Sequence, residues 1–414
     1  MNQIRTMRAI PIIATLGVGA LLPACVGNKT PPGSSPAVQV QNTLALSVDS
    51  GPPGNSGQIN HAYVKVTVCV PGSQSQCMTI DHVLLDTGST GLRLVGSVLG
   101  TTVAFPTATD AQGQKLYECV TFGGGQTWGP VLHADVKLAG ETAANVPIQL
   151  MDDVGSGAPP PAPCGDNGTL INSPAGFGAN GVLGVGVFAQ DCGSACAGAA
   201  TPLPVYYGCS SAGVCTAENA SIAAQVTNPV TMFAADNNGL IVNLPNLVNA
   251  NGDASVTGQV IFGLGTQTDN VLPPTAITVL GTDASGAFAA SYNGAGTALP
   301  ALIDSGTDAI AFDDPTIAVC SSGAFVGYYC PAVAPLNASV LNTGIGANNG
   351  TNMVSFAIAD PNSFVAGAAA FTGLAGGGGS SRFTWGMPFF YGRKVYVGFE
   401  QHTAGSITGP FFAY

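Results

Sequence analysis

The sequence is poor in charged side chains. Only 8% of its 414 residues are charged, and 10 Lys and Arg stand against 22 Asp and Glu, which gives a formal net charge of −12. With so few Lys and Arg residues, the chain cannot form a basic patch, which excludes nucleic acid as a partner. Long amphipathic helices need charged faces, so few are expected, and the 57 glycines favour a mostly β protein. With few ion pairs to lose on acidification, the chain also suits acid conditions.

Residue patterns for metals, cofactors and other hydrolases are absent as well. The cysteines lack the spacing of a zinc site, and the four histidines are scattered along the chain. The run Gly184-Val185-Gly186 lacks the third glycine and the acidic residue of a dinucleotide-binding turn. No Gly-x-Ser-x-Gly elbow of a serine hydrolase occurs. The sequence therefore predicts neither a metal nor a cofactor.

Residues 1–24 are typical of a secretion signal. Two arginines precede an apolar core that is too short to span a membrane. The run Leu-Pro-Ala-Cys that ends at Cys25 resembles the lipobox of bacterial lipoproteins, which predicts lipidation of Cys25, and Val26 after it favours the outer membrane. The alternative is an ordinary secretion signal cleaved near Ala24. Residues 25–37, rich in Pro, Gly and Ser, are the predicted flexible tether.

Ten cysteines follow Cys25, and an even number in an exported chain indicates disulfides. Local spacing predicts four short bridges and leaves one long one, and the four cysteines of residues 190–217 could also pair across each other. The predicted pairs are Cys69–Cys77, Cys192–Cys196, Cys209–Cys215, Cys320–Cys330 and Cys119–Cys164.

Two stretches in different halves of the chain share one pattern. Residues 83–89 read Val-Leu-Leu-Asp-Thr-Gly-Ser, and residues 301–307 read Ala-Leu-Ile-Asp-Ser-Gly-Thr. The apolar run predicts a buried strand, and the glycine allows a tight turn that leaves the carboxylate at the strand end. If Asp86 and Asp304 meet at about 3 Å, they cannot both ionise and hold one proton between them. One carboxyl can then take a proton from water while the other gives one to a carbonyl oxygen.

These residues resemble the two Asp-Thr/Ser-Gly-Thr/Ser turns of the pepsin-like aspartic proteases. The resemblance implies an all-β, bilobal fold of two pseudo-repeated, barrel-like lobes with a cleft between them. It implies that Asp86 and Asp304 are catalytic. It also implies that Thr87 and Ser305 join the two turns, and that Ser89 and Thr307 bond the outer carboxylate oxygens. The supporting residues of the pair are Thr87, Gly88, Ser89, Ser305, Gly306 and Thr307.

A Gly-rich hairpin is predicted over residues 117–140, where the family has a flap that closes over the substrate. The family's Tyr-Gly-x-Gly is replaced by Phe122-Gly123-Gly124-Gly125, so the flap hydroxyl is lost, and Trp128 is a candidate replacement donor. Phe122, Gly123 and Trp128 are therefore the predicted flap and cleft residues. A plain β-hairpin would account for the glycines equally well.

Other family strands are matched at residues 180–186 and 383–399. In the second of these, Met387 stands where the family usually has Asp. A helix start is predicted at Asp313-Asp314-Pro315, and a short helix over residues 221–233. Asp308 either pairs with a base such as Arg393 or is solvated, and solvation is the preferred interpretation.

The sequence predicts an N-terminal lobe over residues 38–245 and a C-terminal lobe over 246–414. The predicted function is that of an exported, lipid-anchored aspartic endopeptidase, a monomer in the periplasm or outer membrane that acts on peptide or protein substrates. The alternative is an inactive binding lipoprotein of the same fold, supported by Phe122 and Met387. A third interpretation is a structural lipoprotein whose Asp86 and Asp304 lie far apart.

Overall fold

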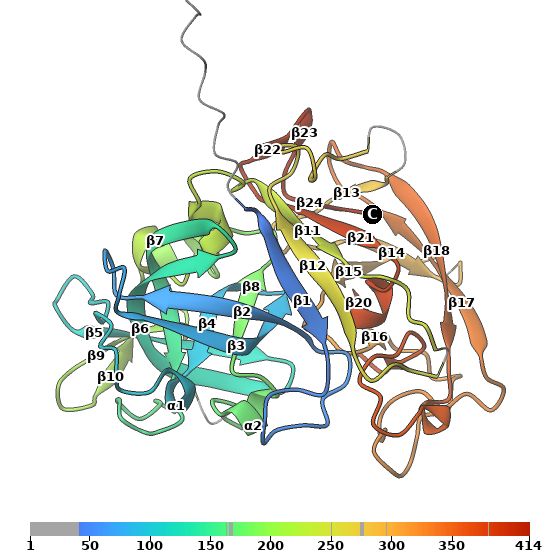
Figure 1. Cartoon of the computed structure of the whole chain (residues 1–414), viewed down its shortest axis with the longest axis horizontal. Helices are drawn as coiled ribbons and strands as arrows, with labels where there is room; N and C mark the ends of the chain where they lie inside the picture. Colours follow the sequence, from blue (N-terminus) through green and yellow to red (C-terminus); the bar gives the residue numbers. More distant parts are fainter. Residues whose placement is uncertain are drawn as a thin grey trace, which may run out of the picture. The chain divides into compact units, whose positions relative to one another are not determined.

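The structure is a computed structural model (Figure 1). It describes residues 41–162, 164, 169–249, 251–273, 277–294, 296–379 and 381–414. The predicted secretion signal, the lipidation site Cys25 and the tether lie outside these residues. Within the described ranges, no helix has both the length and the apolar character that a membrane crossing requires.

The described residues are almost entirely β structure, which confirms the predicted fold class. The helices are single turns: α1 (Gly96–Leu99), α2 (Pro174–Phe177), α3 (Ser194–Ala197), and the 3-10 turns η1 (Ile222–Ala224), η2 (Pro229–Met232), η3 (Pro361–Ser363) and η4 (Met387–Phe389).

The strands fall into two groups along the chain. The first is β1 (Thr43–Val48), β2 (Ala62–Cys69), β3 (Cys77–Asp86), β4 (Thr90–Val95), β5 (Lys115–Phe122), β6 (Gly125–Leu138), β7 (Glu141–Met151), β8 (Gly181–Val185), β9 (Tyr206–Cys209), β10 (Cys215–Ala217) and β11 (Gly239–Asn243). The second is β12 (Val256–Phe262), β13 (Val279–Gly281), β14 (Phe288–Tyr292), β15 (Leu299–Ile303), β16 (Ile310–Ala311), β17 (Leu336–Thr343), β18 (Thr351–Ile358), β19 (Ala375–Gly376), β20 (Phe383–Trp385), β21 (Lys394–Gly398), β22 (Thr403–Ala404), β23 (Ile407–Thr408) and β24 (Phe411–Ala413).

Strands from both ends of the chain share one large sheet. Its order is β10-β9-β5-β6-β7-β4-β8-β3-β2-β1-β12-β11-β21-β24-β13, while β14 to β20 form a separate seven-stranded sheet. Figure 1 shows the blue β1 beside the yellow β12, with β11 and β21 next to them. Because β12 pairs with both β1 and β11, a strand of the second group continues the first group's sheet. The lobe boundary at residue 245 stays a prediction.

Each half contains the same parallel strand pair. In the first half β3 pairs in parallel with β8, with Asp86 opposite Gly184. In the second half β15 pairs in parallel with β20, with Ile303 opposite Trp385. The residues that pair in these strands are mostly buried, as expected for parallel strands covered on both faces. Each pair therefore carries one predicted Asp turn at a strand end inside the core.

The five predicted disulfides are present, and the crossed alternative for residues 190–217 is wrong. Four of them close loops of ten residues or fewer, and Cys119–Cys164 spans 45. Disulfides of this number fit a chain that matures in an oxidising compartment.

Two predicted helices do not form. The Asp314 carboxylate accepts hydrogen bonds from the backbone N–H and hydroxyl of Thr316 and from the Tyr292 hydroxyl, which holds a single turn rather than a helix start. Residues 221–233 contain only η1 and η2, because the chain between them is extended at Gln225 and Asn228.

Candidate active site

The two Asp turns have the same hydrogen bonds. Asp86 ends β3, and its carboxylate accepts from the Gly88 backbone N–H at 2.7 Å and from the Ser89 hydroxyl at 2.5 Å. Asp304 follows β15, and its carboxylate accepts from the Gly306 backbone N–H and the Thr307 hydroxyl, both at 2.8 Å. Each turn thus fixes its carboxyl group through one backbone donor and one hydroxyl.

The two carboxyl groups lie against each other's turns. A methyl carbon added at Gly88 would lie 2.5 Å from the Asp304 carboxyl carbon. One added at Gly306 would lie 2.7 Å from the Asp86 carboxyl carbon. Only glycine leaves room for this approach. The interpretation in which the two acids lie far apart is therefore wrong.

Four hydrogen bonds join the turns across the two halves; we call Thr87 and Ser305 with these bonds the cross-turn clasp. The Thr87 hydroxyl donates to the Ile303 carbonyl at 2.8 Å and accepts from the Ser305 N–H at 3.0 Å. The Ser305 hydroxyl donates to the Leu85 carbonyl at 2.7 Å and accepts from the Thr87 N–H at 3.1 Å. Both side chains are buried, so these bonds form in a medium of low polarity.

Burial and the neighbouring carboxyl perturb Asp86. Desolvation, and then the charge of Asp304, raise the pKa of Asp86 to about 8, against the opposing hydrogen bonds from Ser89 and Gly88. Asp86 is buried, with 6% of its surface exposed, whereas Asp304 is only half-buried. Burial and the neighbouring carboxyl therefore both favour the protonated form of Asp86.

The predicted hairpin is formed by β5 and β6, with Gly123 and Gly124 exposed at its tip. Phe122 closes the hairpin against Gly125, and its ring meets Phe177 of α2 edge-on at 5.3 Å between ring centroids. The hairpin carries Phe122 and Gly123 as predicted; their contact with a substrate stays a prediction.

The proposed role of Trp128 as a replacement donor is wrong. Its ring is buried between Tyr117 and Tyr207, and its indole N–H donates to the Ala158 carbonyl at 2.7 Å. Large aromatic rings are buried where their single N–H finds a partner, and the loop at Ala158 supplies one here. Trp128 therefore supports the base of the hairpin and has no free donor.

Asp308 is half-buried, and no ion pair joins it to Arg393 among the described residues. The Tyr328 hydroxyl donates to its carboxylate, and His61 from the first half is its electrostatic neighbour. Desolvation raises the pKa of Asp308, and it lowers that of His61. Met387 is also buried, and its N–H donates to the Thr307 carbonyl at 2.7 Å, so this departure from the family pattern is a packing residue beside the second turn.

A comparison with known protein families shows which family the chain belongs to. The family model described as "Protein of unknown function (DUF3443)" matches residues 38–414. The chain belongs to the DUF3443 family. No curated protein matches the sequence.

Among solved structures, this DUF3443 protein is similar to the aspartic proteinase from Irpex lacteus. The TM-score is 0.51 at 15% sequence identity, and the match covers 90% of this chain and 96% of that one. At this sequence identity the similarity shows only that the fold is pepsin-like. Any chemical activity has to be argued from the residues of the site.

Sequence reasoning missed a buried ion cluster beside the first turn of this DUF3443 protein. Arg93 on β4 contacts Glu118 at 2.7 Å and Asp191 at 2.9 Å, and all three side chains are buried. The Arg93 guanidinium also donates to the Thr90 carbonyl and lies 5.8 Å from the centre of the Phe122 ring. An arginine inside the otherwise apolar run Leu-Arg-Leu-Val was the available signal, because a buried base requires acidic partners.

Proposed function

We propose that this DUF3443 protein is an aspartic endopeptidase that hydrolyses peptide bonds with water activated by Asp86 and Asp304. The observation that carries the proposal is the approach of two carboxyl groups in equivalent turns, allowed by Gly88 and Gly306 and held by the cross-turn clasp. A merely structural pair of acids would gain nothing from lying so close, since each raises the cost of ionising the other.

The mechanism follows from the unequal burial of the two acids. The protonated Asp86 carboxyl donates its proton to the carbonyl oxygen of the scissile bond, while the Asp304 carboxylate takes a proton from the attacking water. The water oxygen forms a bond to the carbonyl carbon, and the product is a tetrahedral diol. A proton then passes from Asp304 to the amide nitrogen, the C–N bond breaks, and Asp86 recovers its proton from the diol.

The substrate in this proposal is an extended peptide that lies between the β5–β6 hairpin and the Asp turns. Main-chain hydrogen bonds would hold it, and side-chain pockets would select it. The exposed Gly123 and Gly124 leave the hairpin tip free of bulky side chains, which allows close approach to a peptide backbone.

We also infer that the protein is exported and anchored by lipid at Cys25 to the outer membrane. The five disulfides support maturation in an oxidising compartment. The secretion-signal pattern of residues 1–24 and the lipobox-like residues before Cys25 support the anchor.

The test is digestion of a denatured protein mixture by residues 26–414, from pH 3 to 9, with and without a statine-type transition-state mimic. We expect cleavage that the mimic inhibits and that Asp86→Asn or Asp304→Asn lowers by about 1,000-fold or more, because one acid alone cannot perform both proton transfers. Both variants keep the size of the side chain and are expected to fold.

Asp135→Asn is the matched control. Asp135 is equally buried and accepts two backbone hydrogen bonds at 2.8 Å, from Gly72 and Asn145, away from the turns. Its variant should cleave normally. Absence of cleavage at every pH, by a folded protein with five intact disulfides, would reject the protease and favour the binding lipoprotein.

A further inference from the structure

A pocket of about 440 Å³ opens beside the Asp86 turn. It is bordered by Ser89, whose hydroxyl bonds the Asp86 carboxylate, and by the hairpin residues Val120 and Thr121. A substrate residue beside the scissile bond would place its side chain here.

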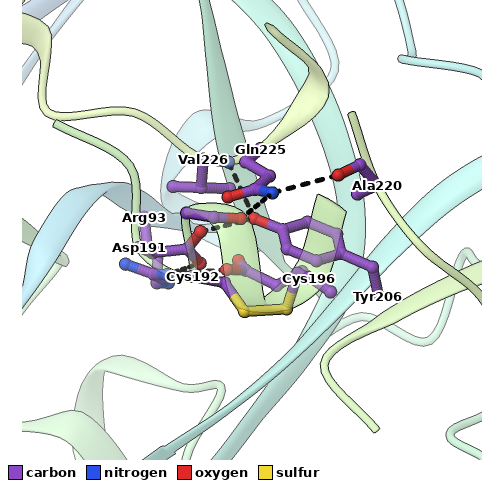
Figure 2. The surroundings of a disulfide bond; sticks show 10 residues. Arg93, Asp191, Cys192, Cys196, Tyr206, Ala220, Gln225 and Val226 are labelled. Carbon is purple, nitrogen blue, oxygen red and sulfur yellow. Dashed lines mark hydrogen bonds and ion pairs between the residues drawn. A yellow bond between two sulfur atoms is a disulfide. The ribbon is translucent and has the colours of Figure 1, made fainter. Parts of the chain in front are cut away.

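The charges at this pocket do not balance. Arg93 is the one base among the pocket's lining residues, and it contacts two acids, Glu118 and Asp191. Figure 2 shows the Asp191 carboxylate between the Arg93 guanidinium and the Tyr206 hydroxyl, which donates to it at 2.7 Å. The side chain of Asp191 is 8% exposed, whereas that of Glu118 is fully buried. A ligand in the pocket can therefore reach Asp191.

The cluster also has an unused acceptor. The Glu118 Oε2 atom is buried and accepts no hydrogen bond from the described residues. Desolvation raises the pKa of Glu118 well above its usual value, although the charge of Arg93 opposes this, and the nearby Asp191 raises it further. The cluster therefore holds two carboxyl groups and one guanidinium, so the second carboxyl group has no cation of its own.

The disulfide Cys192–Cys196 fixes the acid that faces the pocket. Asp191 directly precedes Cys192, and the bridge joins Cys192 to Cys196 of the short helix α3. Figure 2 shows this bridge beside Asp191. The Gln225 side chain donates to the Gly193 carbonyl at 2.8 Å, which holds the same loop from the other side. Asp191 is thus presented on a rigid support, as a specificity determinant requires.

Resting on the proposed protease function, we propose that this pocket selects a positively charged Lys or Arg side chain beside the scissile bond, with Asp191 as the residue that determines specificity. A second cation would give the second acid a partner of opposite charge. An apolar side chain would leave the excess acid as it is, so it gains only contacts with Val120, Pro204 and Val205.

The experiment begins with the position of basic residues around the cleaved bonds of the denatured mixture. Two peptides are then compared that differ only in Lys or Leu at the enriched position. We expect kcat/KM for the Lys peptide to exceed that for the Leu peptide by about tenfold or more, and Asp191→Asn to lower this ratio by about tenfold, the factor that about 1.4 kcal/mol gives. Asp135→Asn should leave the ratio unchanged.

The wild-type protein provides a second measurement that needs no variant to fold. The ratio of the two kcat/KM values should rise with pH. The raised pKa of Glu118 means that the cluster facing the pocket (Arg93 on β4, Glu118 on β5, Tyr206 on β9, and Asp191) gains negative charge as pH rises. A ratio of one or less in the wild type, or a ratio that Asp191→Asn does not change, overturns the specificity proposal while the protease stands. If neither peptide is cleaved and the denatured mixture is also intact, both proposals fail.

Discussion

The two Asp turns are alike in geometry and unlike in their surroundings. Each carboxylate accepts from one glycine N–H and one hydroxyl, and each turn donates to the other through the clasp. Four residues after the acid, however, Thr90 in the first turn corresponds to Asp308 in the second. Seven residues after it, Arg93 corresponds to Ala311.

This difference shows that the positions of the two carboxyl groups and the charges around them depend on different residues. The positions of the reacting carboxyl groups depend on backbone and hydroxyl donors that both halves repeat. The local charges depend on residues outside the repeat: an arginine between two acids in the first half, and Asp308 with Tyr328 and His61 in the second. Changes of charge can thus tune selectivity or pH response without moving the dyad.

The largest effect on stability should come from removing the buried arginine of the first half. Arg93→Met leaves Glu118 and Asp191 buried without a cation and should lower the free energy of unfolding by about 3–5 kcal/mol. Tyr328→Phe in the second half removes one hydrogen bond to Asp308 and should cost about 1 kcal/mol.

Urea denaturation at pH 7 measures both variants, with Arg382→Met, at an exposed position, as the control. If Arg93→Met and Tyr328→Phe lowered the free energy of unfolding equally, the surroundings of the two turns would be energetically equivalent, and the proposed difference between the two halves would be wrong.

The equivalence of the turns themselves can be tested at their glycines. Gly88→Ala and Gly306→Ala each place a methyl carbon within 2.7 Å of the opposite carboxyl carbon, so that carboxyl must move. We expect each variant to lower kcat about a hundredfold, since small displacements of reacting groups have this cost.

Gly198→Ala, where nothing lies within 4 Å of the added carbon, should retain full activity. A large loss in only one of the two turn variants would break the equivalence.

The pH dependence should report the asymmetry of the two acids. The pKa of Asp86 in the folded protein is about 8, and under the proposed function its protonated form is the proton donor. Hydrolysis should therefore fall as pH rises through about 8, by about tenfold per pH unit above it.

The same shift affects stability. The folded state binds the Asp86 proton more tightly than the unfolded state, so its contribution is fully present below the usual pKa of 3.8 and is lost as pH rises through about 8. In Asp86→Asn, the free energy of unfolding should fall less over this window. If the free energy of unfolding of Asp86→Asn had the same pH dependence as that of the wild type, the raised pKa would belong to a residue other than Asp86.

The features that could be predicted from the sequence are those set by local patterns. The Asp turns, the β5–β6 hairpin, the strand before Asp304 and the short disulfides each depend on residues close together in the chain. The pairing of the turns was inferred from their repetition, and the contacts at Gly88 and Gly306 agree with it.

The features that could not be predicted depend on contacts between distant segments. One of the two acids that pair with Arg93 is Asp191, which lies 98 residues away beside the Cys192–Cys196 disulfide, and no local pattern of Asp191 shows this. The partner of the Trp128 indole is a backbone carbonyl, which carries no sequence signal. At Asp314 the helix-start pattern was present, but side-chain hydrogen bonds stabilised a single turn instead.

The cross-turn clasp has a consequence for how the protein matures. Its hydroxyls find their partners only after segments more than two hundred residues apart have met, so the site cannot become ordered before these segments are together. Under the proposed function, a chain still being exported, or one whose halves have come apart, has no competent dyad. The enzyme would acquire its activity only with its completed fold, so a chain that is still unfolded could not cleave its neighbours.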